Sequence, residues 1–485
     1  MRSHTLRRFA LLTAVPLGLA VVAGTGLAGS AQAGTVQAGS GSAAVINGAA
    51  RFQRISGFGA SEAFGQAATV MNEPTAVAQQ ALGLLYGPQG AGLTILRNEL
   101  PSEAGVTIEP NAPASPSSPA SYVPLSATDE DNGQLWFAQQ IRDDFGVRQV
   151  FADAWSAPAF MKTNDSTDNG GTLCGVPGAS CASGDWRQAY ANYMVQYARD
   201  YAQAGIPLEY IGFENEANLA PGYTGMVMTP AQTANFAAVL GPTLARSGLP
   251  TKQECCATEG WDYAAQYAAA IESDPAAYRS VSLFTSHGYT EAPASPLPGW
   301  NKPVWETEWS TFQTWDPAWD DGTTASGFAW AQNIYTGLTS ANLGAFLYWW
   351  GSSTTSENGD NEGLILINGD TVTPSGRLWA FANYSRFVRP GAVRIGATSP
   401  DSSVELTAFR NVNGSVAIVA LNTATTAQSL TFSVDHTGLR GPRAAVPYLT
   451  DSSSNTAAQA PIPVRSGSFS ATLPARSLVT YDITG

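Results

Sequence analysis

The residues best placed to do chemistry are glutamates in two segments, 214–216 (Glu-Asn-Glu) and 306–308 (Glu-Thr-Glu). Each segment follows or ends a short apolar run that is typical of a buried β-strand. Glu216 and Glu308 are 92 residues apart in the chain. If the fold brings them together, a facing pair of carboxyl groups can carry acid/base and nucleophilic chemistry, provided that one stays protonated and the other ionised.

The composition excludes several other chemistries. The chain has only three histidines, His4, His287 and His436, and the first lies in an N-terminal leader. Zinc hydrolases with two or three histidine ligands are therefore excluded. A serine triad would have to use His287, and no G-x-S-x-G elbow is present. The acidic segment 357–362 does not have the spacing of a Ca²⁺ loop, so we favour a solvated turn there and expect no metal and no cofactor.

Two carboxyl groups on opposite sides of a cleft are what hydrolysis of a glycosidic bond requires. One protonates the departing oxygen and the other attacks the anomeric carbon, with retention of configuration at a separation of about 5–5.5 Å. Glu214 and Glu306 compete for these roles, because alternation along a strand places each on the same face as the glutamate two residues later. We favour Glu216 and Glu308, because the later residue of each pair lies nearer the rim of the sheet.

The chain from about residue 54 to residue 389 alternates between β-rich runs and amphipathic helical runs. This pattern predicts an α/β fold in which eight strand–helix units form a (β/α)8 TIM barrel, with functional residues at the C-terminal ends of the strands. A doubly wound sheet is the rival, but 57–60 (Gly-Phe-Gly-Ala) is a poor match to a phosphate-binding turn. The predicted strands are 54–58, 93–96, 147–154, 209–213, 251–256, 282–286, 303–307 and 345–350, and the predicted helices include 76–85, 186–204, 230–247, 264–273 and 327–338.

After Pro390 the pattern changes to short strands separated by turn residues, with no helical run. This pattern predicts an attached β-sandwich side domain. The predicted strands there are 404–409, 415–421, 429–434, 468–473 and 478–483. The predicted domains are a signal peptide (1–33), an N-terminal segment that contributes strands to the side domain (34–54), a catalytic barrel (55–389) and a C-terminal β-sandwich (390–485).

The first 33 residues are typical of an export signal. Three arginines precede a mainly apolar stretch, and 31–33 (Ala-Gln-Ala) matches a cleavage site. A membrane anchor is the alternative, but Pro16 and several glycines interrupt the stretch. No later stretch is long and apolar enough to span a bilayer. We expect a secreted, extracellular protein.

The charge balance indicates the class of partner. Without the leader, the chain has 21 Lys and Arg against 38 Asp and Glu, a net charge of −17. Such a charge repels nucleic acid and anionic membranes, so a neutral polysaccharide or oligosaccharide is the simplest substrate. The 13 Trp and 17 Tyr residues suit stacking on sugar rings, although large cores also use aromatic residues. We expect a monomer.

The four cysteines occur as two pairs. Cys174 and Cys181 lie in a loop rich in Gly and Ser, where an exported protein can form a disulfide. Cys255 and Cys256 are adjacent. Two alternatives stay open for them: a vicinal disulfide, or two free thiols on opposite faces of a strand. Neither pair has the spacing of a zinc site.

The chain resembles glycoside hydrolase family 30, a branch of a large clan of retaining barrel enzymes. The pair Asn215-Glu216 is similar to the clan's acid/base motif on the fourth strand, and 305–309 (Trp-Glu-Thr-Glu-Trp) is similar to the family's nucleophile segment on the seventh. The resemblance implies that Glu216 is the general acid/base and Glu308 the nucleophile. Further segments that resemble the family are 55–61 (Ile-Ser-Gly-Phe-Gly-Ala-Ser), 155–162 (Trp-Ser-Ala-Pro-Ala-Phe-Met-Lys), 385–391 (Ser-Arg-Phe-Val-Arg-Pro-Gly) and 473–477 (Leu-Pro-Ala-Arg-Ser), so the likeness covers nearly the whole chain after the leader.

The resemblance also implies supporting roles for polar residues. Arg97, on the second strand, would hydrogen-bond the nucleophile and hold it ionised. Asn215 would bind the 2-OH of the sugar, a contact that tightens in the transition state. His287 and Tyr289 follow the sixth strand, where the clan often places residues near the nucleophile, with a purely structural histidine as the alternative.

The same resemblance implies a floor of tryptophans under the sugar. Trp155 and the pair Trp349 and Trp350 on the eighth strand would form it. Core packing is the alternative for Trp155 and for whichever member of the pair points inward.

Two segments indicate the subgroup within the family. Residues 62–64 (Glu-Ala-Phe) and 255–261, which begin with the cysteine pair, most resemble the branch that acts on xylan. We therefore expect an endo-type β-1,4-xylanase. A β-glucosidase, a glucosylceramidase, or an enzyme acting on β-1,6-glucan or β-1,6-galactan is the alternative. A non-catalytic carbohydrate-binding protein would lack one of the two carboxylates, and both are present.

Overall fold

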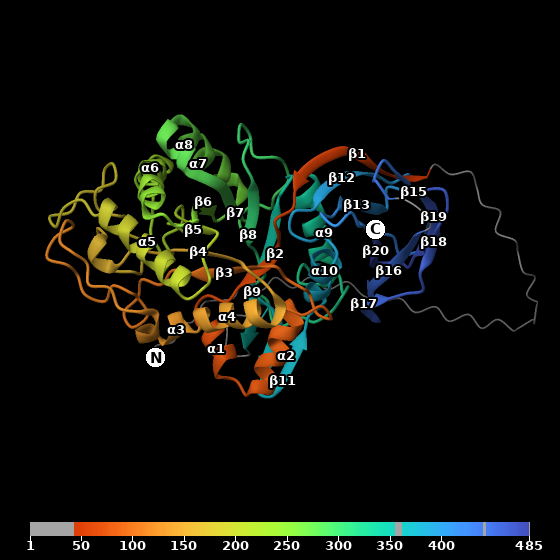
Figure 1. The fold of residues 1–485 in the computed structure, drawn as a ribbon, viewed down its shortest axis with the longest axis horizontal. Coiled ribbons are helices and arrows are strands. Elements are labelled where there is room, and N and C mark those ends of the chain that lie inside the picture. The colour runs from red at the N-terminus through yellow and green to blue at the C-terminus, as the bar shows by residue number, and fades with distance from the viewer. Residues whose placement is uncertain (1–42, 355–360, 440–442, 485) are drawn as a thin grey trace, which may run out of the picture. The chain divides into compact units, whose positions relative to one another are not determined.

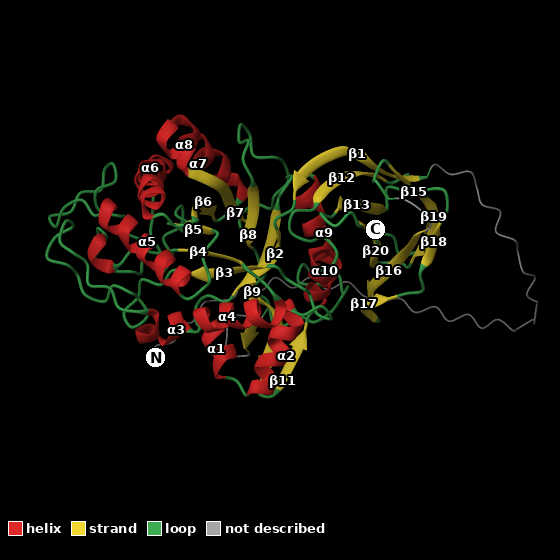
Figure 2. Ribbon diagram, viewed as in Figure 1, coloured by secondary structure: helices red, strands yellow, loops and turns green. Residues whose placement is uncertain are grey.

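The computed structural model describes residues 43–354, 361–439 and 443–484 (Figures 1 and 2). The leader lies outside the described residues, and so does most of the acidic segment 357–362. Among the helices that are described, none combines the length and apolar character needed to cross a membrane.

Eight parallel strands form a closed barrel, which confirms the predicted fold class. Each strand pairs with the next along the chain, and β9 pairs with both β8 and β2, so the ring closes. The barrel strands are β2 (Gly57–Ser61), β3 (Ile95–Glu99), β4 (Gln149–Asp153), β5 (Tyr210–Gly212), β6 (Lys252–Thr258), β7 (Val281–His287), β8 (Val304–Glu308) and β9 (Ala345–Thr354), and β10 (Gly363–Asn368) and β11 (Thr371–Pro374) extend the sheet beyond β9.

Helices alternate with these strands along the chain. They are α1 (Gln66–Asn72), α2 (Thr75–Tyr86), α3 (Asp129–Asn132), α4 (Gln134–Phe145), α5 (Arg187–Gln203), α6 (Pro230–Ser247), α7 (Trp261–Ser273), α8 (Pro275–Ser280), α9 (Gly327–Thr339) and α10 (Gly376–Ser385), with 3₁₀ turns η1 (Leu125–Thr128) and η2 (Ala159–Met161). Local signals set the ends of α6. Thr229 and Gln232 form a capping box, and Gly248 ends the helix in the left-handed conformation.

The barrel interior is packed with apolar side chains rather than open. Trp305 belongs to a cluster of buried apolar residues there, with its ring 5.9 Å from that of Phe151 and 5.3 Å from that of Tyr210. Because the cluster draws on six strands around the ring, its members can meet only inside the barrel. Substrate access is therefore confined to an end of the barrel, where the loops are.

The first barrel strand begins later than predicted. The chain does not form one strand over 54–58; instead β1 (Ala44–Arg54) ends where that run should start, and β2 begins at Gly57. Between them, the Ile55 N–H donates to Ala392 O and the Ser56 N–H donates to Gly344 O. These two residues therefore pass from one sheet to the other, which a run of apolar residues does not reveal.

The remaining strands form the side sheet, in the order β17-β16-β20-β14-β13-β12-β1-β15-β19, with β18 paired to β16. Phe432 on β15 and Phe469 on β19 contact Tyr481 on β20, at ring distances of 5.1 and 5.3 Å. Because β20 is far from β15 in the sheet order, the sheet must curl so that its two halves face each other, as in a β-sandwich. The additional strands are β12 (Val393–Thr398), β13 (Val404–Arg410), β14 (Val416–Asn422), β15 (Gln428–Asp435), β16 (Arg443–Asp451), β17 (Ser454–Ala458), β18 (Ile462–Val464), β19 (Ser468–Leu473) and β20 (Ser477–Ile483).

Both ends of the described chain contribute to the side sheet. β1 pairs antiparallel with β12 and parallel with β15. Polar contacts also join the sheet to barrel elements: Arg476 forms two hydrogen bonds with Asp320, at 2.7 and 2.8 Å, and Thr480 Oγ1 donates to Asn383 O on α10 at 2.6 Å.

Candidate active site

A cleft of about 470 Å³ opens where the barrel strands end. Glu216, Glu308 and Asn215 line it, and so do all three tryptophans singled out from the sequence. The full lining is Phe64, Trp155, Asn215, Glu216, Leu219, Tyr223, Glu259, Tyr289, Glu308, Phe312, Trp349, Trp350 and Glu362. The two predicted segments therefore meet at one end of the barrel.

Glu216 lies in the loop after β5. The strand ends at Gly212, and Glu216 adopts φ of 48°, a left-handed conformation that is unusual for a residue with a side chain. Its N–H donates to Ala257 O at 2.7 Å, which fixes this conformation from the neighbouring strand β6. The expectation that Glu214 and Glu216 share a strand face is therefore wrong, because neither residue lies in the strand.

The surroundings of Glu216 favour its protonated form. Burial raises the pKa of Glu216 to about 8, the negative charge of Glu259 adds to the rise, and the positive charge of Arg97 opposes it. A carboxyl group with this pKa keeps its proton at neutral pH and can give it to a departing oxygen.

Glu308 is the last residue of β8, and its carboxylate accepts hydrogen bonds from two side chains. Its Oε2 accepts from Arg97 Nη1, and its Oε1 accepts from the Tyr289 hydroxyl at 2.9 Å. Burial raises the pKa of Glu308 above its usual value, and the positive charge of Arg97 and its hydrogen bond to Glu308 oppose that rise. Of the two carboxyl groups, Glu308 is therefore the one whose contacts stabilise the ionised form.

Arg97 connects the residues around Glu308. Its Nε donates to Asp153 Oδ2 at 2.6 Å, and its Nη2 donates to Asn215 Oδ1 at 2.6 Å. Burial lowers the pKa of Arg97, but the negative charges of Asp153 and Glu308 outweigh this and leave the pKa above its usual value. Arg97 stays charged and holds three side chains in fixed orientations.

His287 lies between the two glutamates. Its Nδ1 is 2.9 Å from Glu216 Oε1, and its Nε2 is 3.7 Å from Glu308 Oε2. Burial lowers the pKa of His287 to about 4, so the ring is neutral at physiological pH. One carboxylate oxygen of each glutamate and one nitrogen of His287 lie within 4.8 Å of one another.

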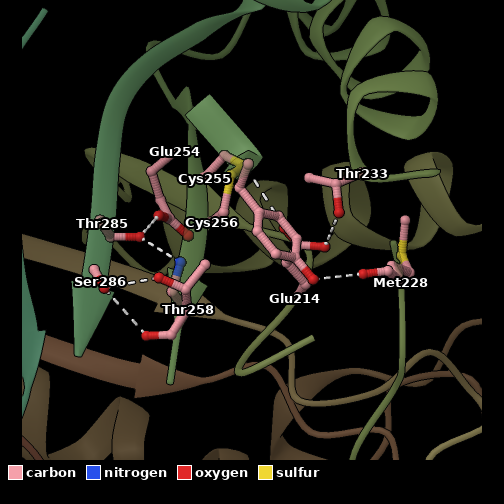
Figure 3. Close-up of a disulfide and its surroundings, with 11 residues drawn as sticks. Glu214, Met228, Thr233, Glu254, Cys255, Cys256, Thr258, Thr285 and Ser286 are labelled. Carbon is pink, nitrogen blue, oxygen red and sulfur yellow. Dashed lines mark hydrogen bonds between the residues drawn. A yellow bond between two sulfur atoms is a disulfide. The ribbon is translucent and has the colours of Figure 1, made fainter. Parts of the chain in front are cut away.

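The two competing glutamates point away from the cleft. Glu214 is fully buried, and its Oε2 accepts from Thr233 Oγ1 on α6 at 2.7 Å (Figure 3). Glu306 is also fully buried, and its Oε2 accepts from Trp261 Nε1 on α7 at 2.7 Å. Neither residue lines the cleft.

Aromatic side chains form much of the cleft wall. Trp349 and Trp350 stack on each other at 5.2 Å, and Trp155 lies 5.8 Å from Trp349. The guanidinium of Arg97 lies 4.6 Å from the Trp155 ring. Three further aromatic residues that the sequence did not single out for the site, Phe64, Tyr223 and Phe312, line the cleft with 36%, 49% and 65% of their surface exposed.

The cleft is acidic. Glu259 and Glu362, which were not among the predicted site residues, join the two central glutamates in its lining. No Lys or Arg lines the cleft in the part of the chain that the structure describes. Lys162 is buried, and its ammonium group donates to Ser156 Oγ, Thr167 O and Gly225 O. It does not line the cleft.

All four cysteines form disulfides. Cys174 pairs with Cys181, as expected. Cys255 pairs with Cys256, which decides between the two alternatives in favour of the vicinal disulfide (Figure 3). The vicinal disulfide lies on β6, directly before Ala257, whose carbonyl accepts the hydrogen bond from Glu216.

Comparisons with known proteins agree with the geometry. The glycosyl hydrolase family 30 TIM-barrel domain matches residues 125–297, and the glycosyl hydrolase family 30 beta sandwich domain matches residues 391–481. Among solved structures, the catalytic domain of the GH30 xylanase C from Talaromyces cellulolyticus is 40% identical with a TM-score of 0.84, and the match covers 91% of this chain and 100% of that one.

Two further relatives are named for different activities. The glucuronoxylanase XynC of Bacillus subtilis is 25% identical over 363 residues, which are 73% of this chain and 78% of that protein. The lysosomal acid glucosylceramidase of Mus musculus is 26% identical over 309 residues, or 59% of this chain and 58% of that protein.

Proposed function

This chain belongs to glycoside hydrolase family 30, and from that premise we propose that it hydrolyses β-1,4-xylan as an endo-type enzyme with net retention of anomeric configuration. The observation that carries the mechanism is the pair Glu216 and Glu308, which line one cleft with one carboxylate oxygen of each within 4.8 Å of the other. This short separation fits a retaining enzyme better than an inverting one, which needs roughly 6.5–9.5 Å between carboxyl groups to admit a water.

In the first step Glu308 attacks the anomeric carbon. Arg97 and Tyr289 hold it ionised and orient its oxygens. As the new bond to Glu308 forms, the glycosidic bond breaks, and its oxygen takes the proton of Glu216. The first product leaves, and a covalent glycosyl ester on Glu308 remains.

In the second step a water replaces the first product. Glu216, now ionised, takes a proton from this water as the water attacks the anomeric carbon, and the ester bond to Glu308 breaks. Both glutamates return to their starting states. The two inversions together give net retention.

The remaining lining residues bind the sugar. Asn215 accepts from Arg97 through Oδ1, so its amide hydrogens remain for the 2-OH of the sugar. Trp155, Trp349 and Trp350 provide flat apolar surfaces on which sugar rings stack. The exposed aromatic side chains at the rim extend this surface beyond the scissile bond.

Xylan is the substrate that the relatives favour. The relative from Talaromyces cellulolyticus, at 40% identity over 91% of this chain, is named a xylanase. The glucosylceramidase and an endo-1,6-β-D-glucanase of Aspergillus fumigatus, at 26% and 23% identity, give the alternatives. The acidic lining and the absence of Lys and Arg among its described residues suit an uncharged chain.

We further propose that the protein is exported and acts outside the cell. The leader has the pattern of a signal peptide. The two disulfides fit an oxidising compartment. N-terminal sequencing of protein from the culture medium should begin at Gly34, and recovery of the uncleaved chain only inside the cell would contradict export.

A substrate panel tests the activity. The purified enzyme is incubated with xylan, β-1,6-glucan, β-1,6-galactan and glucosylceramide, and the products are separated by size. We expect xylan to be cleaved fastest, with internal cuts that release oligosaccharides of mixed length. A Glu308→Gln variant prepared in parallel excludes contaminating enzymes. Faster hydrolysis of any other member of the panel would contradict the substrate assignment.

A further inference from the structure

Beneath the cleft, two buried carboxyl groups face each other without a visible hydrogen bond. Glu254 on β6 and Asp153 on β4 are both fully buried. In each residue one carboxyl oxygen has no hydrogen-bond partner, Oε1 in Glu254 and Oδ1 in Asp153. Both lie against Gly212 on β5, where an added methyl group would stand 1.5 Å from Glu254 Oε1 and 2.1 Å from Asp153 Oδ1. Two ionised carboxylates cannot share such a dry site, so one proton must lie between them.

The other contacts show which residue holds that proton. Arg97 donates to Asp153 Oδ2 at 2.6 Å, which favours the negative charge on Asp153. Glu254 Oε2 accepts only a neutral hydroxyl, that of Thr285, at 2.6 Å. Burial, followed by the charge of Asp153, raises the pKa of Glu254 well above its usual value. With its proton on Oε1, Glu254 donates to Asp153 Oδ1, and both unpaired oxygens are satisfied.

Glu254 is thereby connected to the nucleophile. The connection runs from Glu254 to Asp153, from Asp153 to Arg97, and from Arg97 to Glu308. Arg97 also donates to Asn215, so the same connection orients the residue that binds the sugar.

A second connection leads from Glu254 to the acid/base residue, and Figure 3 shows its first contact, between Glu254 and Thr285. Thr285 Oγ1 donates to Glu254 and accepts from the Ala257 N–H at 2.8 Å. The Ala257 carbonyl accepts from the Glu216 N–H at 2.7 Å. Ala257 and Glu216 both have left-handed backbones, at φ of 43° and 48°, so each needs its neighbours to hold it there.

We propose that Glu254, which is fully buried and does not line the cleft, is a positioning residue that in its protonated form joins the hydrogen-bonded supports of Glu216 and Glu308. The inference rests on the proposed roles of these two glutamates. Glu254 is the point where the two hydrogen-bonded connections meet, so removing its donor and acceptor loosens both carboxyl groups at once. Misplacement of reacting groups lowers the rate of the chemical step more than it weakens substrate binding.

Two substitutions test whether the hydrogen bonds of a protonated Glu254 are needed for catalysis. In Glu254→Gln, the amide N–H can donate to Asp153 and the amide oxygen can accept from Thr285, so the variant should keep most of kcat. In Glu254→Leu, the side chain has a similar size but makes neither bond, so kcat should fall about tenfold to hundredfold, with KM within about threefold of the parent. Gln253→Leu, on the adjacent position of the same strand, is the matched control and should keep kcat, because Gln253 is buried but has no side-chain partner.

An infrared measurement tests protonation without any substrate. The difference spectrum of wild type minus Glu254→Gln at pH 7 should show the carbonyl band of a protonated carboxylic acid. An ionised carboxylate band instead would overturn the inference even if the enzyme is a xylanase. Conversely, failure of the wild type to cleave any β-glycoside would reject the proposed function and leave the infrared result standing.

The kinetic outcomes are equally decisive. Loss of activity in Glu254→Gln to the level of Glu254→Leu, or full kcat in Glu254→Leu, would reject the positioning role. If Glu254→Leu does not fold, Thr285→Val takes its place, because it removes the hydroxyl that joins Glu254 to Ala257 and changes little else. A Thr285→Val variant with unchanged kcat would then overturn the inference.

Discussion

Glu216 and Glu308 lie on opposite sides of one neutral imidazole, that of His287. The ring is 2.9 Å from an oxygen of Glu216 and 3.7 Å from an oxygen of Glu308. A neutral ring has one N–H and one acceptor nitrogen, so it can accept from a protonated Glu216 and present its N–H to an ionised Glu308. The geometry thereby supports opposite protonation states for two carboxyl groups that are close together.

Substitution of either glutamate should remove activity without unfolding the protein. Glu308→Ala and Glu216→Gln should each lower kcat by at least about three orders of magnitude, because the first removes the nucleophile and the second the transferable proton. Circular dichroism and thermal unfolding should match those of the parent.

Azide distinguishes the two variants. It is small enough to enter the space left in Glu308→Ala and should restore turnover there, giving a glycosyl azide of inverted configuration. Near-full activity of either variant without azide would show that the assignment is wrong.

The dependence of kcat/KM on pH should follow the two glutamates. Activity should rise with pH as Glu308 ionises, and fall as pH rises through about 8, where Glu216 loses its proton. Glu259→Gln removes a negative charge that raises the pKa of Glu216, so the alkaline limb should move to lower pH.

Glu362→Gln is the control for this experiment. Glu362 also lines the cleft, but its charge is not among the causes that raise the pKa of Glu216. In the Glu362→Gln variant, the fall of kcat/KM at alkaline pH should therefore occur at the same pH as in the parent. A Glu259→Gln profile that coincides with the parent, or shifts to higher pH, would contradict the electrostatic account.

A glucuronic acid branch on the xylan should not be required. A site that reads such a branch needs a fixed cation, because a buried anion must be paired. No described residue of the cleft lining is Lys or Arg, and the loop 351–375 contains neither in its sequence. We expect rates on glucuronoxylan and on arabinoxylan low in glucuronate to differ by less than about tenfold, and a preference of a hundredfold or more for glucuronoxylan would reveal a cationic subsite.

Deletion of residues 391–485 should give insoluble protein rather than a free barrel. The deletion removes β12 and β15, so β1 loses both of its neighbours and presents two unpaired edges. It also uncovers barrel residues that pack against Phe409 and Leu478. A soluble, monodisperse and active truncated protein would contradict this expectation, and size-exclusion chromatography would detect it.

The regular elements of the fold were largely predictable from local patterns. The helix over 230–247 has the same limits in the structure, because Thr229, Pro230 and Gly248 mark its ends. The first barrel strand was misplaced by three residues, because Ile55 and Ser56 bond to residues more than 280 positions away. Hydrogen bonds to residues so far away in the chain cannot be predicted from a local sequence pattern.

The site was predictable where a residue ends a strand. Glu308 fits that rule, and Glu216 was found although its orientation comes from a left-handed backbone rather than from alternation. Glu259 directly follows β6, so the same rule applied to every strand would have found it. Tyr223 lies in a loop whose approach to the cleft depends on tertiary packing, and no sequence signal marks it.

The most direct test of the account is the configuration of the first product released from xylan. Proton NMR spectra are recorded in the first minutes of hydrolysis, before the free sugar ends equilibrate by mutarotation. Two displacements through Glu308 predict that the β-anomer appears first and that the α-anomer grows in only later. A first-formed α-anomer would mean a single displacement by water, which contradicts the assignment of Glu308 as the nucleophile.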